Sequence, residues 1–165
     1  MSITFDSCKI LQVLITLERR GHEFYLEAAH AMKDNEAKNM FFKLAQDELE
    51  HERVYKELMA KLPETKQCSI AAEEADFLEL LLSTNFFIND HQQVDKMKKM
   101  WSKREALLIA EKLERDTILF LTELAALDPE LAEENVIKAA LKEERRHLSM
   151  ILQRIMDANV PGLML

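Results

Sequence analysis

The sequence has 165 residues, 30 of them acidic and 22 basic, so its formal net charge is −8. This length fits one domain with a hydrophobic core, and a 48% share of hydrophobic residues excludes a disordered chain. An acidic balance argues against a nucleic-acid partner, because phosphate binding needs a basic face. Only two glycines and three prolines occur, which excludes glycine-rich nucleotide loops and folds of many short strands. Long helices with few breaks are therefore expected.

The cysteines and the N-terminal residues bear on the cellular compartment. Cys8 and Cys68 form neither a CxxC pair nor a disulfide framework, which suits a reducing compartment. Residues 1–9 lack the basic start and apolar run of a signal peptide. No stretch approaches the length of about 18 uncharged apolar residues that a membrane span needs. We therefore expect a cytoplasmic protein with no membrane partner.

Four long helices are predicted from the apolar periodicity. Their expected ranges are 7–32, 36–62, 95 or 102 to 127, and 129–158. A turn is expected at Asp34-Asn35, and Asp128-Pro129 is expected to start the fourth helix as an N-cap followed by proline. Ser102 with Glu105 matches the S-x-x-E capping box. The short turns predict two antiparallel hairpins, 7–62 and 96–158.

The segment 63–95 between the hairpins is long enough to cross a helical bundle from end to end. The predicted fold class is therefore all-α. It is a four-helix bundle in which one long crossover joins two antiparallel helix hairpins, which is the ferritin-like arrangement. We expect a single domain over residues 1–165.

Each long helix has one glutamate in the middle of its apolar stripe. In helix order these are Glu18, Glu48, Glu114 and Glu144. A carboxylate that faces a core must be neutralised, paired or bound to a metal, because its desolvation is unfavourable. Lysine and arginine are almost absent from these stripes, so two divalent cations are the partners expected for four negative charges. His51 and His147 each follow a glutamate by three residues and add nitrogen ligands.

The spacing of these residues repeats along the chain. Glu18 and Glu114 lie 96 residues apart, and the same offset separates the E-x-x-H motifs at 48–51 and 144–147. Such an internal repeat places the two sets face to face about a pseudo-twofold axis. The segment 27–30 also fits E-x-x-H, but it faces away from Glu18 and has no histidine at the same offset. A chance repetition is the alternative, and the unfavourable burial of charge argues against it.

The ligand types indicate the metal. Oxygen and imidazole ligands without thiolates suit iron or manganese. A glutamate from each of two helices and Glu-x-x-His from each of the other two is the ligand set of di-iron carboxylate bundles. We therefore expect two iron ions, with manganese or a mixed pair as the alternative. Asp47 and Glu143, each four residues before a histidine, are either imidazole-orienting groups or solvated acids. His22 is a weaker candidate for contact with the site.

With these ligand positions, the chain resembles the di-iron domain of the rubrerythrins over nearly its whole length. The matching stretches are ITLERRGHEFYLEAA, LAQDELEHERVYKEL, IAEKLERDTILFLTEL and LKEERRHLSMIL. The resemblance implies the metal ligands Glu18, Glu48, His51, Glu114, Glu144 and His147. It also implies a seventh ligand, Glu111, which in that family is associated with redox-linked movement of one iron. Glu111 breaks the repeat, because Ile15 stands at the matching offset. Tyr25 follows the family pattern, whereas Leu121 stands where a second tyrosine is expected.

The resemblance implies a non-haem di-iron oxidoreductase that reduces hydrogen peroxide, with no catalytic residue predicted beyond the metal ligands. Rubrerythrins usually have a rubredoxin-like domain with paired CxxC motifs, and this sequence contains none. We therefore expect a separate electron donor such as a rubredoxin-like protein. Two alternatives are a ferritin-like ferroxidase or iron-storage module, and a non-enzymatic helical module that metals stabilise. Apolar residues in 63–95, such as Phe86 and Phe87, favour a homodimer and would allow hairpin exchange.

Overall fold

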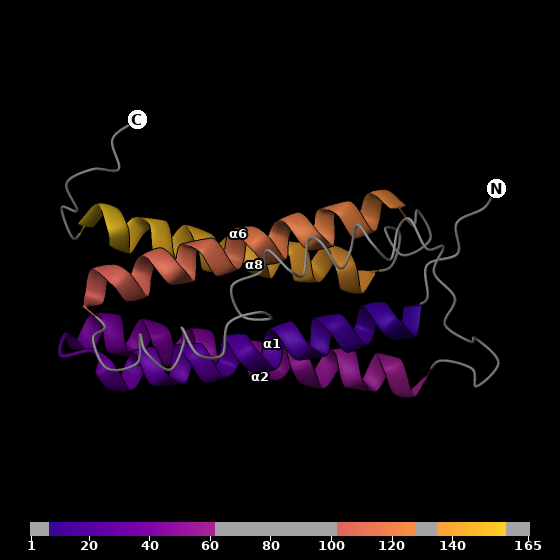
Figure 1. The fold of residues 1–165 in the computed structure, drawn as a ribbon, viewed down its shortest axis with the longest axis horizontal. Helices are drawn as coiled ribbons and strands as arrows, with labels where there is room; N and C mark the ends of the chain where they lie inside the picture. The colour runs from indigo at the N-terminus through magenta and orange to yellow at the C-terminus, as the bar shows by residue number, and fades with distance from the viewer. Residues whose placement is uncertain (1–6, 62–101, 128–134, 158–165) are drawn as a thin grey trace.

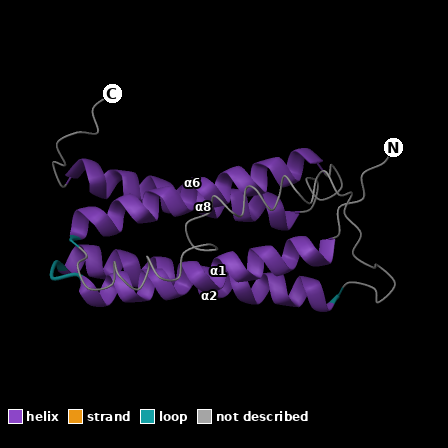
Figure 2. Ribbon diagram, viewed as in Figure 1, coloured by secondary structure: helices purple, strands orange, loops and turns teal. Residues whose placement is uncertain are grey.

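The computed structural model describes residues 7–61, 102–127 and 135–157. Its four helices are α1 (Ser7–Ala31), α2 (Asn35–Ala60), α6 (Lys103–Leu127) and α8 (Asn135–Asp157). They form a bundle of two layers, with α1 beside α2 and α6 beside α8 (Figure 1). Helices paired in a layer are antiparallel, and between the layers α1 meets α6 while α2 meets α8. No strand occurs within these described ranges (Figure 2).

The first hairpin has the predicted helices, with ends that shift by one or two residues. α1 ends at Ala31, and α2 runs from Asn35 to Ala60 rather than over 36–62. Asp34, predicted as part of a turn, is the N-cap of α2, with φ −79° and ψ 121°. Its carboxylate accepts a hydrogen bond of 3.0 Å from the backbone N–H of Glu36. This bond satisfies one of the free N–H groups at the helix start, so Asn35 is already helical.

The predicted capping box before α6 is confirmed. The Ser102 backbone N–H donates to Glu105 Oε2 at 2.8 Å, and the Glu105 N–H donates to Ser102 Oγ at 3.2 Å. α6 therefore starts at Lys103, after the later of the two predicted starts. α2 ends at the opposite end of the bundle from the start of α6 (Figure 1). The predicted crossover 63–95 and the predicted start of the fourth helix at 128–129 lie outside the described residues.

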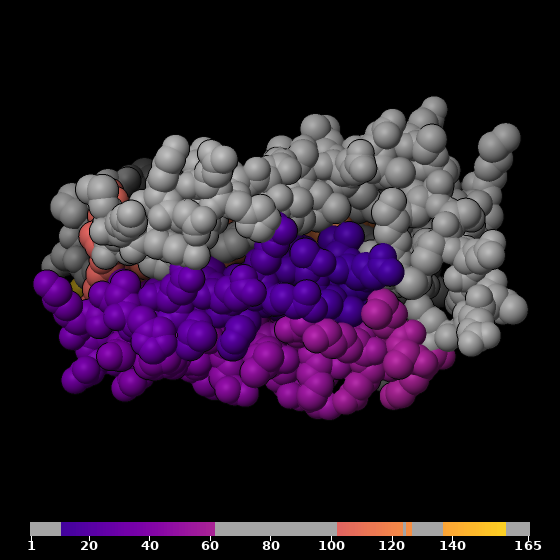
Figure 3. Space-filling model, turned by 60° about the horizontal axis from the view of Figure 1, so that its bottom comes forward, coloured from indigo at the N-terminus to yellow at the C-terminus, as the bar shows by residue number. Residues whose placement is uncertain are grey.

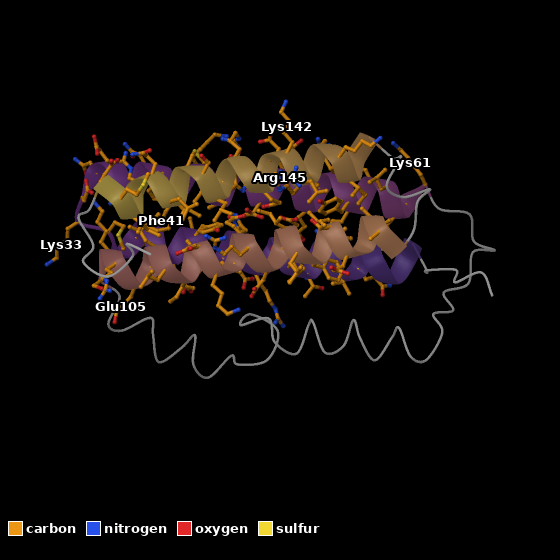
Figure 4. All side chains as sticks on the ribbon, turned by 90° about the horizontal axis from the view of Figure 1, so that it is seen from above. Lys33, Phe41, Lys61, Glu105, Lys142 and Arg145 are labelled. Atoms are coloured by element: carbon orange, nitrogen blue, oxygen red, sulfur yellow. The ribbon has the colours of Figure 1, made fainter. Side chains whose placement is uncertain are left out.

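The apolar stripes of the four helices form the core between the layers. Phe41, Leu44, Leu107 and Ile151 are fully buried. Figure 4 shows Phe41 inside the bundle and Lys142 directed away from it. The side chains of α1 and α2 meet along their hairpin (Figure 3). This packing places one face of each helix toward a shared interior.

Ion pairs connect the two hairpins. Lys103 donates to Asp34, and Arg154 Nη1 lies 2.6 Å from Glu36 Oε2. Such exposed pairs contribute little stability, but they help to fix how the hairpins sit against each other. Among the described helices, none is long and apolar enough to cross a membrane.

Candidate metal centre

The four glutamates that the apolar stripes predict to face the core are all buried in the structure. Their exposed fractions are 1% for Glu18, 5% for Glu48, 2% for Glu114 and 1% for Glu144. Each comes from near the middle of a different helix, because each occupies the centre of that helix's apolar stripe. His147 is also fully buried, and the side chain of His51 is 15% exposed. Six carboxylate and imidazole groups therefore share one interior region.

The ligand atoms of these residues form two overlapping groups, and within each group they lie within 4.8 Å of one another. One group is Glu18, Glu48, His51 and Glu144, and the other is Glu48, Glu114, Glu144 and His147. Nδ1 of His51 lies 3.3 Å from Oε1 of Glu144, and Nδ1 of His147 lies 3.2 Å from Oε1 of Glu48. Glu48 and Glu144 belong to both groups. These two carboxylates are therefore placed where they could help to hold two ions.

Burial sets the protonation of the carboxylates. It is the largest cause that raises the pKa of Glu18, Glu48 and Glu114 well above the usual glutamate value, and repulsion from neighbouring carboxylates adds to it. Burial acts in the same direction on Glu144, but the two neighbouring histidines outweigh it and lower its pKa. The cluster therefore cannot ionise fully without added positive charge.

The neighbouring carboxylates raise the pKa values of both histidines. Burial alone would lower the pKa of His147, but Glu144, Glu48 and Glu114 outweigh it and raise that pKa to about 10. The pKa of His51 is also raised, against the effect of burial, chiefly by Glu144. Both shifts show that the carboxylates attract positive charge to this region, which protons or metal ions can supply.

Unpaired polar atoms provide a test of whether a metal fits. Among the described residues, several buried ligand atoms have no hydrogen-bond partner. They are both carboxylate oxygens of Glu18, Oε1 of Glu144, Nδ1 of His51 and both ring nitrogens of His147. Buried polar atoms are normally hydrogen-bonded, so this number in one place needs an explanation. Coordination would satisfy the carboxylate oxygens and one nitrogen of each imidazole, and two dications would balance four carboxylates. The oxygen and imidazole donors fit iron or manganese.

The phenol of Tyr25 contacts this cluster, and the repeat provides no second phenol at the equivalent position. It is buried, and its hydroxyl donates a hydrogen bond to Oε1 of Glu114. Burial, followed by the charge of Glu114, raises the pKa of Tyr25 well above the usual value, so the phenol stays a donor. At the offset of 96 residues stands Leu121, which is fully buried and apolar. The two halves of the site therefore differ in their surroundings.

The side chain of Asp47, on α2, contacts residues of α8 in the other hairpin. Its Oδ2 lies 3.4 Å from Nε2 of His147 and 2.8 Å from Nη2 of Arg146. It thus contacts the histidine of the second E-x-x-H motif, although in the sequence it precedes His51. Glu143 accepts from Nε of Arg146 at 2.8 Å and contacts no imidazole within the described residues. The two acids, equivalent in the repeat, therefore have different surroundings.

The remaining sequence candidates lie outside the two groups. Glu111 is half-buried and accepts a hydrogen bond of 2.9 Å from Nε of Arg115, so its role as a ligand stays a prediction. Nδ1 of His22 lies 2.7 Å from the carbonyl oxygen of Ala45, on the backbone of α2. His30, of the segment 27–30, is exposed, as its helix position predicts.

Sequence reasoning missed Glu52, an acid that is 5% exposed. Burial would raise its pKa, but Lys56 and Arg19 outweigh this effect and lower it. Nζ of Lys56 lies 2.7 Å and Nη2 of Arg19 lies 2.9 Å from Oε1 of Glu52. The only signal in the sequence is Lys56 four residues later, which is also the usual spacing of exposed helical pairs.

Sequence reasoning also missed a small cavity beside the cluster. Its volume is about 10 Å³, and its wall includes the four cluster glutamates. Gly21 of α1 and Thr117 of α6 also line it. Gly21 was a usable signal, because glycine inside a helix is unfavourable and needs a reason.

The comparison with known families decides what this chain is related to. The rubrerythrin family model matches residues 9–155. The chain belongs to the rubrerythrin family. Its membership confirms the resemblance that the four sequence stretches indicate, and the buried ligand groups of this rubrerythrin-family chain lie within the matched residues.

A solved structure supports the fold. This rubrerythrin-family chain is similar to a protein from Thermotoga maritima described as a ferritin-like diiron-carboxylate protein, with a TM-score of 0.71 and 20% sequence identity. The match covers 96% of this chain and 100% of the other. It confirms the predicted ferritin-like four-helix bundle. Among curated proteins, none matches the sequence.

Proposed function

We propose that this protein is a di-iron oxidoreductase that reduces hydrogen peroxide to water. The observation that carries the proposal is a buried group of four glutamates and two histidines, with donor atoms that lack other partners, in a rubrerythrin-family chain. Held by these residues, two ferrous ions would supply the two electrons that, with two protons, reduce one hydrogen peroxide to two water molecules. The protein's own residues hold the ions and limit access of water.

Each ligand has a distinct place in this proposal. Glu48 and Glu144 would help to hold both ions, because each belongs to both groups of ligand atoms. Tyr25 would orient Glu114 by its hydrogen bond, since it is the only phenol among the described residues that donates to the cluster. The terminal pairs would be Glu18 with His51, and Glu114 with His147.

The partners and location belong to the same proposal. An external donor protein would return the iron to the ferrous state, because the sequence has no CxxC pair that could form a rubredoxin-like electron-transfer site. The apolar residues of 63–95 support a homodimer, and the cysteine content supports a cytoplasmic location.

Two measurements test the proposal. Protein produced in iron-supplied cells should contain about two irons per chain by metal analysis, as expected for this ligand set. A variant that combines His51→Ala with His147→Ala should contain much less. In stopped-flow absorption, peroxide should oxidise the reduced, iron-loaded protein much faster than oxygen does. Equal or slower oxidation by peroxide would overturn the peroxidase assignment and leave the metal site intact.

The ferritin-like fold favours iron handling as a second candidate function. A ferroxidase or storage module would use oxygen to oxidise many more ferrous ions than its site holds, and storage would need a hollow assembly of many chains. Light scattering and a ferrous iron titration distinguish the two functions. A dimer that stops at about two irons per chain supports the peroxidase. Bound metal that does not change when oxidant is added would instead indicate a purely structural role.

A further inference from the structure

Tyr55 of α2 is a buried phenol outside the groups that would hold metal. It is 1% exposed, and its hydroxyl has no hydrogen-bond partner among the described residues. Neither group of ligand atoms includes it, and it does not line the small cavity beside the cluster. A buried hydroxyl is normally hydrogen-bonded, because leaving one unsatisfied is unfavourable. The burial of this hydroxyl therefore calls for a reason.

The internal repeat relates the two core clusters of the bundle. Tyr25 and Ile151 belong to one cluster, and Tyr55 and Leu121 belong to the other. At the offset of 96 residues, Tyr25 corresponds to Leu121, and Tyr55 corresponds to Ile151. Each cluster therefore contains one phenol and one four-carbon aliphatic side chain at the same pair of repeat positions. The helix that supplies the phenol differs, because it is the first helix of the hairpin, α1, in one cluster and the second helix, α2, in the other.

Glu18 is the carboxylate that this exchange leaves for Tyr55. Tyr25 donates to Glu114, and the offset of 96 residues relates Glu114 to Glu18. Leu121 has no donor to offer Glu18, and neither oxygen of Glu18 has a hydrogen bond among the described residues. Burial raises the pKa of Tyr55 well above its usual value, and of the neighbouring charges that of Glu18 has the largest further effect. The phenol therefore stays protonated near a carboxylate that lacks a donor.

We propose that Tyr55 is a positioning residue for Glu18, and that its hydroxyl donates to one oxygen of Glu18 when the other oxygen holds a metal ion. The bond would satisfy two buried groups at once, and a hydrogen bond to an ionised carboxylate is stronger than one between neutral groups. It would orient a metal ligand, as the bond from Tyr25 orients Glu114. The inference rests on the part of the proposed function in which the cluster holds metal ions.

Tyr55→Phe removes the hydroxyl and keeps the ring. We expect its manganese affinity in a calorimetric titration to fall about tenfold, as is typical when a group that orients a metal ligand is lost. With a chelator, the variant should unfold at the same or a higher urea concentration than the parent, because it loses an unsatisfied hydroxyl. A purely structural role would instead lower stability. Tyr25→Phe is the matched comparison and should lower both quantities, because its bond to Glu114 is already present in the structure.

A pair of double variants separates the hydroxyl from the packing. Tyr55→Ile with Leu121→Tyr gives the second cluster the arrangement of the first and should restore the manganese affinity of the parent. Tyr55→Ile with Leu121→Phe has nearly the same volume without the hydroxyl and should remain about tenfold weaker. Equal affinities of these two variants would contradict a role for the hydroxyl.

Raman spectroscopy detects the hydrogen bond itself. The chain has two tyrosines, so Tyr25→Phe leaves Tyr55 as the only one. The intensity ratio of its tyrosine doublet should change to that of a hydrogen-bond donor when saturating manganese is added. An unchanged ratio, or a Tyr55→Phe protein that binds manganese as tightly as the parent, would show that the inference is wrong while the proposed function stands. A parent that binds no manganese and no iron overturns the proposed function and this inference with it.

Discussion

At the scale of single residues, Glu18 is unfavourable for folding and yet central to the candidate site. It is 1% exposed, and neither carboxylate oxygen has a hydrogen bond among the described residues. Glutamine keeps the shape and removes the charge. We expect Glu18→Gln to raise the free energy of unfolding of the metal-free protein near pH 7.5 by about 1–2 kcal/mol and to weaken metal binding.

Urea unfolding with a chelator, followed by a manganese titration, would measure both effects. Glu23→Gln is the matched control, since Glu23 is exposed on the same helix. It should change neither stability nor metal binding. A metal-free Glu18→Gln protein that is less stable than the parent would contradict the idea that the buried charge opposes folding.

Asp47 and Glu143 provide a matched pair, because they hold equivalent positions in the repeat. Only Asp47 lies against an imidazole, 3.4 Å from Nε2 of His147, whereas Glu143 pairs with Arg146. Mutation of a group that orients a metal-binding histidine typically lowers metal affinity by about 10- to 100-fold. We expect Asp47→Asn to weaken manganese binding by about that factor and Glu143→Gln to change it less than about twofold. Equal effects of the two variants in a calorimetric titration would show that the contact has no orienting role.

At the scale of the helix, the start of α6 depends on hydrogen bonds within its first turn. Ser102 and Glu105 exchange hydrogen bonds across the first turn. Removing the hydroxyl in Ser102→Ala should lower the free energy of unfolding by about 1 kcal/mol, because one N–H at the helix start loses its partner. Ser149→Ala is the control, since Ser149 is exposed within α8 and alanine favours a helix interior. Urea unfolding in which both variants lose the same stability would argue against the cap.

The helices were predictable because their apolar residues follow a single period over more than 20 residues each. The ends were less predictable, because they depend on a few local bonds. Asp34 starts α2 one residue earlier than predicted by accepting from the N–H of Glu36. α2 ends at Ala60, before the predicted end, and the N–H of Lys61 donates to the carbonyl oxygen of Leu58 at 3.0 Å. Pro63 disfavours a helical residue directly before it, which accounts for an earlier end.

At the scale of the whole molecule, the burial of the four glutamates was predictable, because it needs only the helix period and the repeat. The contacts between the hairpins were not predictable from the sequence. Asp47 meets His147 only because α2 packs on α8, and no sequence spacing encodes that crossing. The cavity at Gly21 and Thr117 likewise depends on how α1 packs against α6. Sequence periodicity tells which face of a helix is buried, and packing determines which buried residues meet.

The cluster also gives the metal-free protein a pH dependence with a definite sign. Burial raises the folded-state pKa of Glu18, Glu48 and Glu114 above the usual value of 4.5. Their stabilising contribution is therefore fully present below about pH 4.5 and is lost as the pH rises through the folded values. His51 and His147 act in the same direction, with a contribution that is fully present below about pH 6.5 and is lost as the pH rises through their raised folded-state pKa values, about 10 for His147.

Groups with lowered pKa values act oppositely, but at lower pH. For Glu52 and Glu144, the stabilising contribution is present above about pH 4.5 and is lost as the pH falls. The raised groups therefore dominate between about pH 5 and 8, and we expect the metal-free protein to become less stable across this interval.

Thermal unfolding with a chelator, followed in parallel with saturating manganese, would check this expectation. Metal binding requires deprotonated ligands, so its stabilisation should grow with pH and reverse the trend of the metal-free protein. Glu18→Gln should flatten the metal-free profile, because it removes one of the titrating groups, whereas Glu23→Gln should leave it unchanged. A metal-free protein that is as stable at pH 8 as at pH 5 would show that the buried carboxylates do not depend on bound protons when metal is absent.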